Sequence, residues 1–190
     1  MNIVVLAGGN STEREVSSVS SQGVCGALRE RNHRAILLDA YFGREKLEED
    51  LFPAEYDIEK EVAWMKAKSR ELEETMKNRK EFFGPYVLDI CKAADIVFLA
   101  LHGANGEDGK VQSVLDLMGI PYTGSGHLSS AMAMDKGITK MVFEAAGVPT
   151  PKGVTLDQKA CTSKLSDYGM AFRVIVKPCL RVPSVRVLFA

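Results

Sequence analysis

The sequence lacks most of the features that mark specialised classes of protein. Its four cysteines are far apart and form no CxxC pair or Cys/His cluster, which excludes a disulfide framework and predicts reduced, buried thiols rather than a zinc site. No apolar run approaches the roughly 18 residues that a membrane span needs. A formal net charge of −1 excludes a dedicated nucleic-acid surface. We therefore expect a soluble cytoplasmic protein with no nucleic-acid or membrane partner.

The sequence has the composition of a globular protein. Hydrophobic residues make up 46% of the 190 positions and charged residues 26%, enough for one ordinary domain or two small ones with a real core. The apolar start, Met1–Ala7, is short and has no basic leader, so it predicts a first strand and not a signal peptide.

The most informative stretch runs from Asp95 to Gln112, DIVFLALHGANGEDGKVQ. Its first seven residues are mostly apolar or β-branched, which is typical of a buried parallel strand. Three glycines follow within seven residues, and then an apolar-periodic run predicts a helix. Such a turn is where an open α/β sheet binds ligands, and His102, Glu107 and Asp108 are its titratable groups. The alternative is a plain turn, in which the two carboxylates merely favour a helix N-terminus.

A second glycine turn, near the start of the chain, has the same form. Asn2–Ala7 predicts a short strand that ends at Gly8–Gly9, and Arg34–Asp39 predicts the next strand. Thr12 and Glu15 have capping-box spacing for the helix between these strands, and small residues on that helix predict close packing against the sheet. Two strands and a connecting helix make a right-handed βαβ unit.

The first turn does not match GxGxxG, so a dinucleotide site is a weak interpretation. The turn nevertheless places polar side chains at a helix N-terminus, where they can contact a polar ligand. Glu13 is the notable residue. Its plain interpretation is a surface acid that suits the helix dipole, and the alternative is a ligand contact.

The rest of the chain reads as helices and short strands. Residues 41–80 carry interleaved charges, which predicts a solvated helix around Glu59–Lys80 that serves as a lid or an interface element. Trp64, Met65 and Leu72 have roughly helical spacing and are its expected packing stripe. A helix is expected from Pro85, and a turn-rich linker near residue 124 predicts a domain boundary. Beyond the linker, we expect helices at 128–134 and 136–146, strands at 154–156 and 172–177, and a helix between those strands at 158–168.

Five motifs, taken in order, resemble those of the D-alanine–D-alanine ligases. They are LAGGNSTEREVS (6–17), ALHGANGEDGKVQ (100–112), GIPYTGSG (119–126), MDK (134–136) and VIVKP (174–178). Together they cover the chain from its start to about Pro178. Five motifs at compatible spacings are far more specific than any single glycine loop.

The resemblance implies an α/β fold with two parts. Residues 1–124 would form a Rossmann-like (pre-ATP-grasp) parallel-sheet domain with a helical insertion at 41–84, and residues 125–190 an incomplete ATP-grasp central domain. The implied reaction is ATP-dependent ligation of two D-alanines to D-alanyl-D-alanine, for peptidoglycan precursor synthesis. ATP phosphorylates the carboxylate of the first D-alanine, and the amine of the second attacks the acyl phosphate. Mg²⁺ as a cofactor and a homodimer are also implied.

Particular residues match the functional positions of the family. Glu13 falls where the ammonium of the first D-alanine is held, and His102 where a histidine orients the same substrate, so both are assigned as catalytic and substrate-binding. Glu107 and Asp108 are expected to order their loop rather than touch substrate. Lys136, Lys177 and Ser184 match ATP-binding positions, although Lys177 also suits a plain strand-end lysine. No residue of this chain is assigned to a metal.

The end of the sequence departs from the family pattern. The family carries a glycine- and serine-rich loop after Lys177-Pro178, whereas here the segment Cys179–Val187 has no glycine. Pro183 also removes a backbone N–H from a loop that should bind phosphate through its amides. The magnesium carboxylates are expected in a C-terminal part outside this sequence, and we therefore expect no ligase turnover from the 190-residue chain alone.

Two alternatives to this assignment remain. One is a non-catalytic binding or dimerisation fragment of such a ligase. The other is a related ligase that makes D-alanyl-D-lactate or D-alanyl-D-serine, because the pocket for the second substrate lies largely outside this chain.

Overall fold

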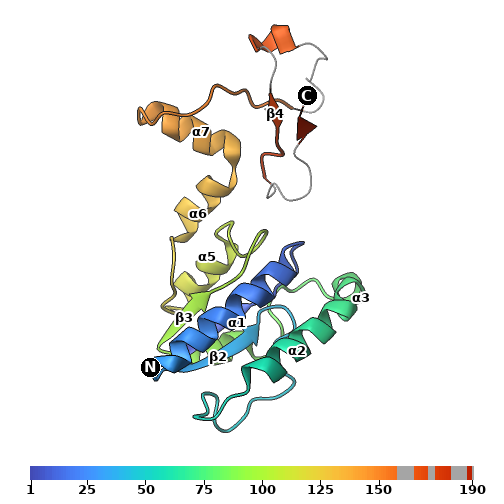
Figure 1. Ribbon diagram of the computed structural model, residues 1–190, viewed down its shortest axis with the longest axis vertical. Coiled ribbons are helices and arrows are strands. Elements are labelled where there is room, and N and C mark those ends of the chain that lie inside the picture. Colours follow the sequence, from blue (N-terminus) through green and yellow to red (C-terminus); the bar gives the residue numbers. More distant parts are fainter. Residues whose placement is uncertain (158–164, 171–173, 181–187, 190) are drawn as a thin grey trace. The chain divides into compact units, whose positions relative to one another are not determined.

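A computed structural model describes residues 1–157, 165–170, 174–180 and 188–189 (Figure 1). Its contacts divide the chain into two compact units, Met1–His127 and Leu128–Ala190. The boundary expected at residue 124 stays a prediction.

The first unit is built on a parallel sheet of three strands in the order β2-β1-β3. β1 (Asn2–Ala7) lies in the middle, between β2 (Arg34–Asp39) and β3 (Ile96–Leu99), and both pairings are parallel. An isolated parallel bridge joins Val97 of β3 to Tyr122 on its outer side. The predicted α/β fold with a parallel sheet is confirmed.

Helices cover both faces of this sheet (Figure 1). α1 (Arg14–Glu30) and α2 (Ile58–Lys68) contact each other and share one core cluster with β1 and β2. α4 (Val87–Ala93) and α5 (Lys110–Leu117) share a second cluster with the same strands. Successive side chains of a strand point to opposite faces, so β1 contributes to both clusters. It is therefore buried along most of its length.

The charged segment before β3 belongs to the core, so the expectation of a solvated lid is wrong for α2. Val62 and Met65 of α2 are 4% and 0% exposed and pack beneath α1. The helix continues into the short turn η1 (Ser69–Glu71) and then α3 (Leu72–Asn78), which has no buried residue. The interleaved charges do mark a helix, and its predicted packing stripe is confirmed at Met65, with Trp64 partly buried against the same core cluster.

The predicted capping box of α1 is wrong. The helix begins at Arg14 with Glu13 as its N-cap residue, and no side chain caps it, so Thr12 and Glu15 form no capping box. Ser11 instead accepts a hydrogen bond from the backbone N–H of Glu13, at 3.1 Å. The predicted packing of small residues against the sheet is confirmed at Cys25, which is 0% exposed and whose Sγ lies 3.6 Å from the carbonyl oxygen of Ala35, whereas a Cβ placed on Gly23 would meet no atom within 4 Å.

The second unit contains short elements. α6 (His127–Met134) begins at its boundary, and α7 (Lys136–Ala145) follows. A 3-10 turn spans Leu165–Tyr168, and the two-residue strands β4 (Ile175–Val176) and β5 (Leu188–Phe189) pair antiparallel. The two predicted helices are confirmed. The strand expected at 172–177 is regular only in β4.

The strand expected at residues 154–156 is wrong. This segment has no regular secondary structure, and the side chains of Val154 and Leu156 are 46% and 40% exposed. Within the described part of the chain no strand pairs with it, and β-branched composition alone does not supply a hydrogen-bonding partner. Most of the helix expected at 158–168 lies outside the described residues.

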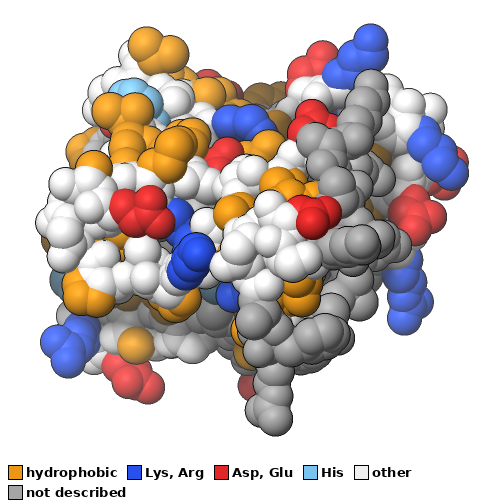
Figure 2. Space-filling view, turned by 90° about the horizontal axis from the view of Figure 1, so that it is seen from above, with side chains coloured by type: hydrophobic (Ala, Val, Ile, Leu, Met, Phe, Trp, Pro, Cys, Tyr) orange, Lys and Arg blue, Asp and Glu red, His pale blue; other side chains and the backbone are white. Residues whose placement is uncertain are grey.

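Charges of both signs are interspersed with exposed hydrophobic side chains on the face drawn in Figure 2. This mixture agrees with the formal net charge of −1. None of the helices in the described ranges is both long enough and apolar enough to cross a membrane.

Candidate functional site

The first turn, between β1 and α1, is shaped by two glycines with positive φ. Gly8 and Gly9 have φ of +72° and +80°, in the left-handed region that other residues rarely adopt. The N–H of Gly8 donates to the hydroxyl of Ser17, at 2.9 Å. The turn ends at Glu13, whose half-buried carboxylate stands at the N-terminus of α1.

The second turn, between β3 and α5, is ordered by its own carboxylates. Glu107 accepts from the N–H of Gly103 at 2.7 Å, and Asp108 accepts from the N–H of Asn105 at 3.1 Å. Burial acts to raise the pKa of Asp108, but hydrogen bonds from Lys110 and Asn105 outweigh it and leave the pKa below its usual value. The prediction that Glu107 and Asp108 order this loop is confirmed.

The two turns meet at the carboxyl edge of the sheet. The hydroxyl of Ser17 donates to the carbonyl of Ala100 at 2.7 Å, and that of Ser11 donates to the carbonyl of His102 at 2.6 Å. α1 and α5 leave the two turns toward opposite faces of the sheet, which is the arrangement that opens a crevice in doubly wound folds. The sequence therefore predicts the meeting of the turns correctly.

Glycine at position 103 allows the turns to approach this closely. A Cβ placed there would lie 3.2 Å from Oγ of Ser11 and 3.4 Å from Oε2 of Glu13. The carboxylate of Glu13 thus lies directly beside the residue that follows His102. The structure brings together the two residues that the sequence assigned to one ligand, while their roles stay predictions.

The imidazole of His102 is held from the side of α1. Its Nε2 lies 3.0 Å from the hydroxyl of Ser20. Ser17 and Ser20 were not among the predicted site residues. Both lie on the helix face of Glu13, four and seven residues further along α1, because a helix has 3.6 residues per turn. Serines at those spacings from the acid are a signal that can be read from the sequence.

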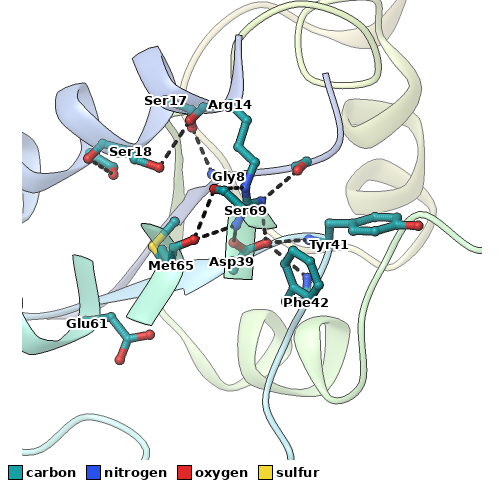
Figure 3. A network of polar contacts seen from close by, with 12 residues as sticks. Gly8, Arg14, Ser17, Ser18, Asp39, Tyr41, Phe42, Glu61, Met65 and Ser69 are labelled. Atoms are coloured by element: carbon teal, nitrogen blue, oxygen red, sulfur yellow. Dashed lines mark hydrogen bonds and ion pairs between the residues drawn. The ribbon is translucent and has the colours of Figure 1, made fainter. Parts of the chain in front are cut away.

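A buried ion pair between Arg14 and Asp39 supports the first turn (Figure 3). Arg14 and Asp39 are 3% and 0% exposed, and two nitrogens of the guanidinium contact the two carboxylate oxygens at 3.2 and 2.5 Å. Arg14 also donates to the carbonyls of Gly9 and Met65 and to the hydroxyl of Ser69.

The same pair explains the glycine at position 8. A Cβ there would lie 2.5 Å from Oδ2 of Asp39 and 2.8 Å from a guanidinium nitrogen of Arg14. Asp39, at the end of β2, also accepts from the N–H groups of Tyr41 and Phe42. Gly8 is therefore required by the protein's own interior, and not by the approach of a ligand.

The residues assigned to ATP lie in the second unit. Lys136 opens α7, and its N–H donates to the carbonyl of Cys179 at 3.2 Å, which joins the helix start to the segment that follows Lys177. Asp135 caps the first turn of α7, because its carboxylate accepts hydrogen bonds from the N–H groups of Gly137 and Ile138. A phosphate here would therefore meet lysine side chains rather than those two amides. Ser184 lies outside the described residues.

In residues 1–157 and the shorter described segments, no group of three or more His, Cys, Asp or Glu side chains could hold a metal ion. Cys25 and Cys91 are free and buried, as predicted, and Cys179 is half-buried. Cys161 lies outside the described residues.

A parallel sheet with two glycine turns that meet at its strand edge, and with a carboxylate and an imidazole beside them, defines a Rossmann-like ligand-binding domain followed by a second unit. The chain belongs to the family described as "D-ala D-ala ligase N-terminus", whose model matches residues 2–125.

Relatives and solved structures agree with this assignment. A D-alanine--D-alanine ligase of Lacticaseibacillus casei (strain BL23) is 42% identical over 187 residues, which cover 94% of this chain and 51% of the relative. One of Synechococcus sp. (strain JA-3-3Ab) is 39% identical and is covered over 37% of its length. The crystal structure of the ligase from Bacillus anthracis has a TM-score of 0.65 at 26% identity, over all of this chain and 49% of that one.

The same Bacillus anthracis ligase complexed with ATP has a TM-score of 0.62 at 26% identity, over 50% of its chain. The present chain thus spans about half the length of most of these relatives.

Proposed function

We propose that this chain carries the first amino-acid pocket and part of the nucleotide site of an ATP-dependent ligase. The ligase joins two D-alanines through an acyl phosphate, for peptidoglycan precursor synthesis. One observation carries the proposal: Ser11 and Ser17 tie the turn of Glu13 to the turn of His102. The choice of D-alanine is supported by family membership and by the names of the relatives.

The residues suit the chemistry of this reaction. A free α-amino acid is a zwitterion, and the carboxylate of Glu13 is a hydrogen-bond acceptor of the right charge for its ammonium group. His102 orients the same molecule from the neighbouring turn. A carboxylate is a poor electrophile until phosphorylation turns its oxygen into a leaving group. The charge of the phosphates that take part must be neutralised, and Lys136 and Lys177 would do so.

Two further parts of the proposal concern the setting of the reaction. Mg²⁺ accompanies ATP in such reactions, but the described residues hold no carboxylate cluster that fits it, so no step is assigned to the ion here. Because ATP is the proposed phosphoryl donor, we place the protein in the cytoplasm.

The proposal predicts a selective effect of Glu13→Gln. Loss of the charge should weaken D-alanine binding about 10- to 100-fold, because hydrogen bonds to charged groups contribute roughly 1.5–3 kcal/mol. ATP binding should change little, because the residues assigned to ATP lie in the second unit. Titration calorimetry of the 190-residue chain with D-alanine, and separately with ATP, measures both affinities.

Glu15→Gln is the matched control. It removes the same charge from the first turn of the same helix, but Glu15 is exposed, so D-alanine affinity should stay within about twofold of wild type, since exposed charges contribute little. Equal losses of D-alanine affinity in the two variants would mean that Glu13 acts only through the overall electrostatic field of the domain. That result would contradict the proposed pocket.

A second candidate function is self-association. Val16 and Val19, on the outer side of α1, are 53% and 67% exposed, and adjacent exposed apolar side chains favour an interface. We propose that this helix contributes to a homodimer, whether or not the chain takes part in catalysis. Sedimentation velocity should show a dimer for the wild type and a monomer for Val19→Glu. A monomeric wild type contradicts this candidate.

A further inference from the structure

Ser20 contacts His102 and also the backbone of its own helix. Its Oγ lies 3.0 Å from Nε2 of His102, and at 3.0 and 3.2 Å from the carbonyl oxygens of Val16 and Ser17. Three polar atoms therefore surround a hydroxyl that has a single proton to donate.

The direction of these hydrogen bonds follows from what each group can do. A carbonyl oxygen only accepts, so in both of its contacts within the helix Ser20 is the donor, to the carbonyls of Val16 and Ser17. If the hydroxyl proton went to Nε2 instead, the oxygen of Ser20 would face both carbonyl oxygens with no hydrogen between them. Every contact is satisfied only when Nε2 of His102 carries a proton and donates it to Ser20.

We infer that Ser20 is a positioning residue that holds neutral His102 in its Nε2–H tautomer and fixes the orientation of the ring. The other nitrogen, Nδ1, is then the acceptor of the imidazole. Ser20 reaches His102 because it lies seven residues after Glu13, two helical turns along the same face of α1. One helix therefore supplies both the acid and the group that orients the imidazole.

The inference gives the site a preference for one end of its ligand, and this step rests on the proposed function. The carboxylate of Glu13 and Nδ1 of His102 both accept hydrogen bonds, whereas an ammonium group has three N–H donors. Both groups therefore suit the ammonium end of an amino acid. An α-hydroxy acid, which has one donor and no cation at that position, should be a poor ligand of this pocket.

Nitrogen NMR of the 190-residue chain tests the tautomer without any ligand. The sequence has three histidines, so His33→Gln and His127→Gln variants assign the signals of His102. At alkaline pH, where imidazoles are neutral, we expect a protonated Nε2, an unprotonated Nδ1, and an observable Nε2–H proton. Ser20→Ala should lose that proton signal through exchange with water. Ser20→Thr should keep it, because a threonine hydroxyl can also bond the carbonyl four residues earlier.

Ser18→Ala is the matched control. The hydroxyl of Ser18 donates to the carbonyl of Arg14 at 3.1 Å, the same kind of bond within the same helix, so this variant should leave the spectrum of His102 unchanged. A wild-type His102 protonated on Nδ1 overturns the inference. An Nε2–H signal that survives in Ser20→Ala overturns it as well.

Ligand titration followed by NMR provides the second measurement. Ser20→Ala should weaken D-alanine binding about two- to tenfold, the range expected for one hydrogen bond, and Ser20→Thr should restore it. D-lactate should bind more weakly than D-alanine to the wild type. If wild type shows the Nε2–H tautomer but binds no D-alanine, the proposed function fails while the role of Ser20 stands. If Ser20→Ala binds D-alanine as wild type does, the positioning role fails.

Discussion

Arg14, the residue after Glu13, shows a limit on what the sequence reveals about a single side chain. Glu13 and Arg14 are consecutive charges, and such pairs usually lie on solvated surfaces. Arg14 is instead 3% exposed and bonded to Asp39. Its burial depends on Met65 and Ser69, which come about fifty positions later in the chain. Local pattern cannot show a partner so distant in sequence.

The buried pair predicts a large effect of Arg14→Met on stability. The variant leaves Asp39 buried without its cation, and breaking such a pair costs about 3–5 kcal/mol of unfolding free energy. Urea denaturation followed by circular dichroism measures this loss.

Arg31→Met, at the exposed C-cap of the same helix, is the control for Arg14→Met and should change stability by less than about 0.5 kcal/mol. Similar losses of unfolding free energy in the two variants would show that the buried ion pair contributes no more to stability than an exposed arginine does. The double variant Arg14→Met with Asp39→Asn should recover part of the loss, because no isolated charge stays buried.

At the scale of elements, the two glycine turns were predictable from the sequence, whereas the packing of α2 against the sheet was not. Apolar runs followed by glycines are local signals, so β1, β3 and both turns follow from the sequence. For α2 the packing stripe around Met65 was predicted, but local pattern did not show that this stripe joins the core of the sheet rather than forming a lid or an interface. The segment at 154–156 shows the same limit, because a strand exists only with a partner.

The contact between the turns predicts a specific effect of Gly103→Ala. Residue 103 has φ of +74°, and the new Cβ would press on Ser11 at 3.2 Å and separate the turns. We expect a loss of about 2 kcal/mol in unfolding free energy, of which about 1 kcal/mol is backbone strain, together with weaker D-alanine binding. Urea denaturation and calorimetry measure the two effects.

Gly119→Ala separates strain from contact. Gly119 has φ of +65°, but a Cβ there meets nothing within 4 Å, so only the strain of about 1 kcal/mol should remain and D-alanine binding should persist. If both variants bind D-alanine equally well, the close approach of the turns is not needed for the pocket.

For the whole molecule, the sequence predicted the order of the main elements and the burial of reduced cysteines, which holds for Cys25 and Cys91, but not the size of its effect on the thiols. Burial raises the pKa of the Cys25 thiol to about 11, although Arg29 lowers it, and burial raises that of Cys91 to about 12. The shifts depend on how deeply each thiol is covered, because both thiols become buried when the two layers of helices pack on the sheet.

The raised pKa values predict inert thiols in the folded chain. At pH 8 only about one Cys25 side chain in a thousand is a thiolate, and the thiolate is the reactive form. Iodoacetamide should therefore leave Cys25 and Cys91 unmodified in the native protein and label both in urea, as peptide mass spectrometry can show. Labelling of either thiol at the rate of the unfolded chain contradicts the packing described.

The same groups set the sign of a pH dependence. Their folded pKa values lie above the ordinary value of 9.0, so their contribution to stability is complete below pH 9 and is lost as the pH rises toward 11 and 12. Unfolding free energy should thus fall with alkaline pH, and urea denaturation across that range measures the slope.

Ser17 forms two hydrogen bonds, with Gly8 on one side and Ala100 on the other. These bonds bear on the free energy of ligand binding. In the proposed amino-acid site, these bonds would hold the two turns together before a ligand binds. Binding of an amino acid there would then lose less free energy to ordering of the backbone, and more of the cost would come from the ligand's own lost motion and desolvation.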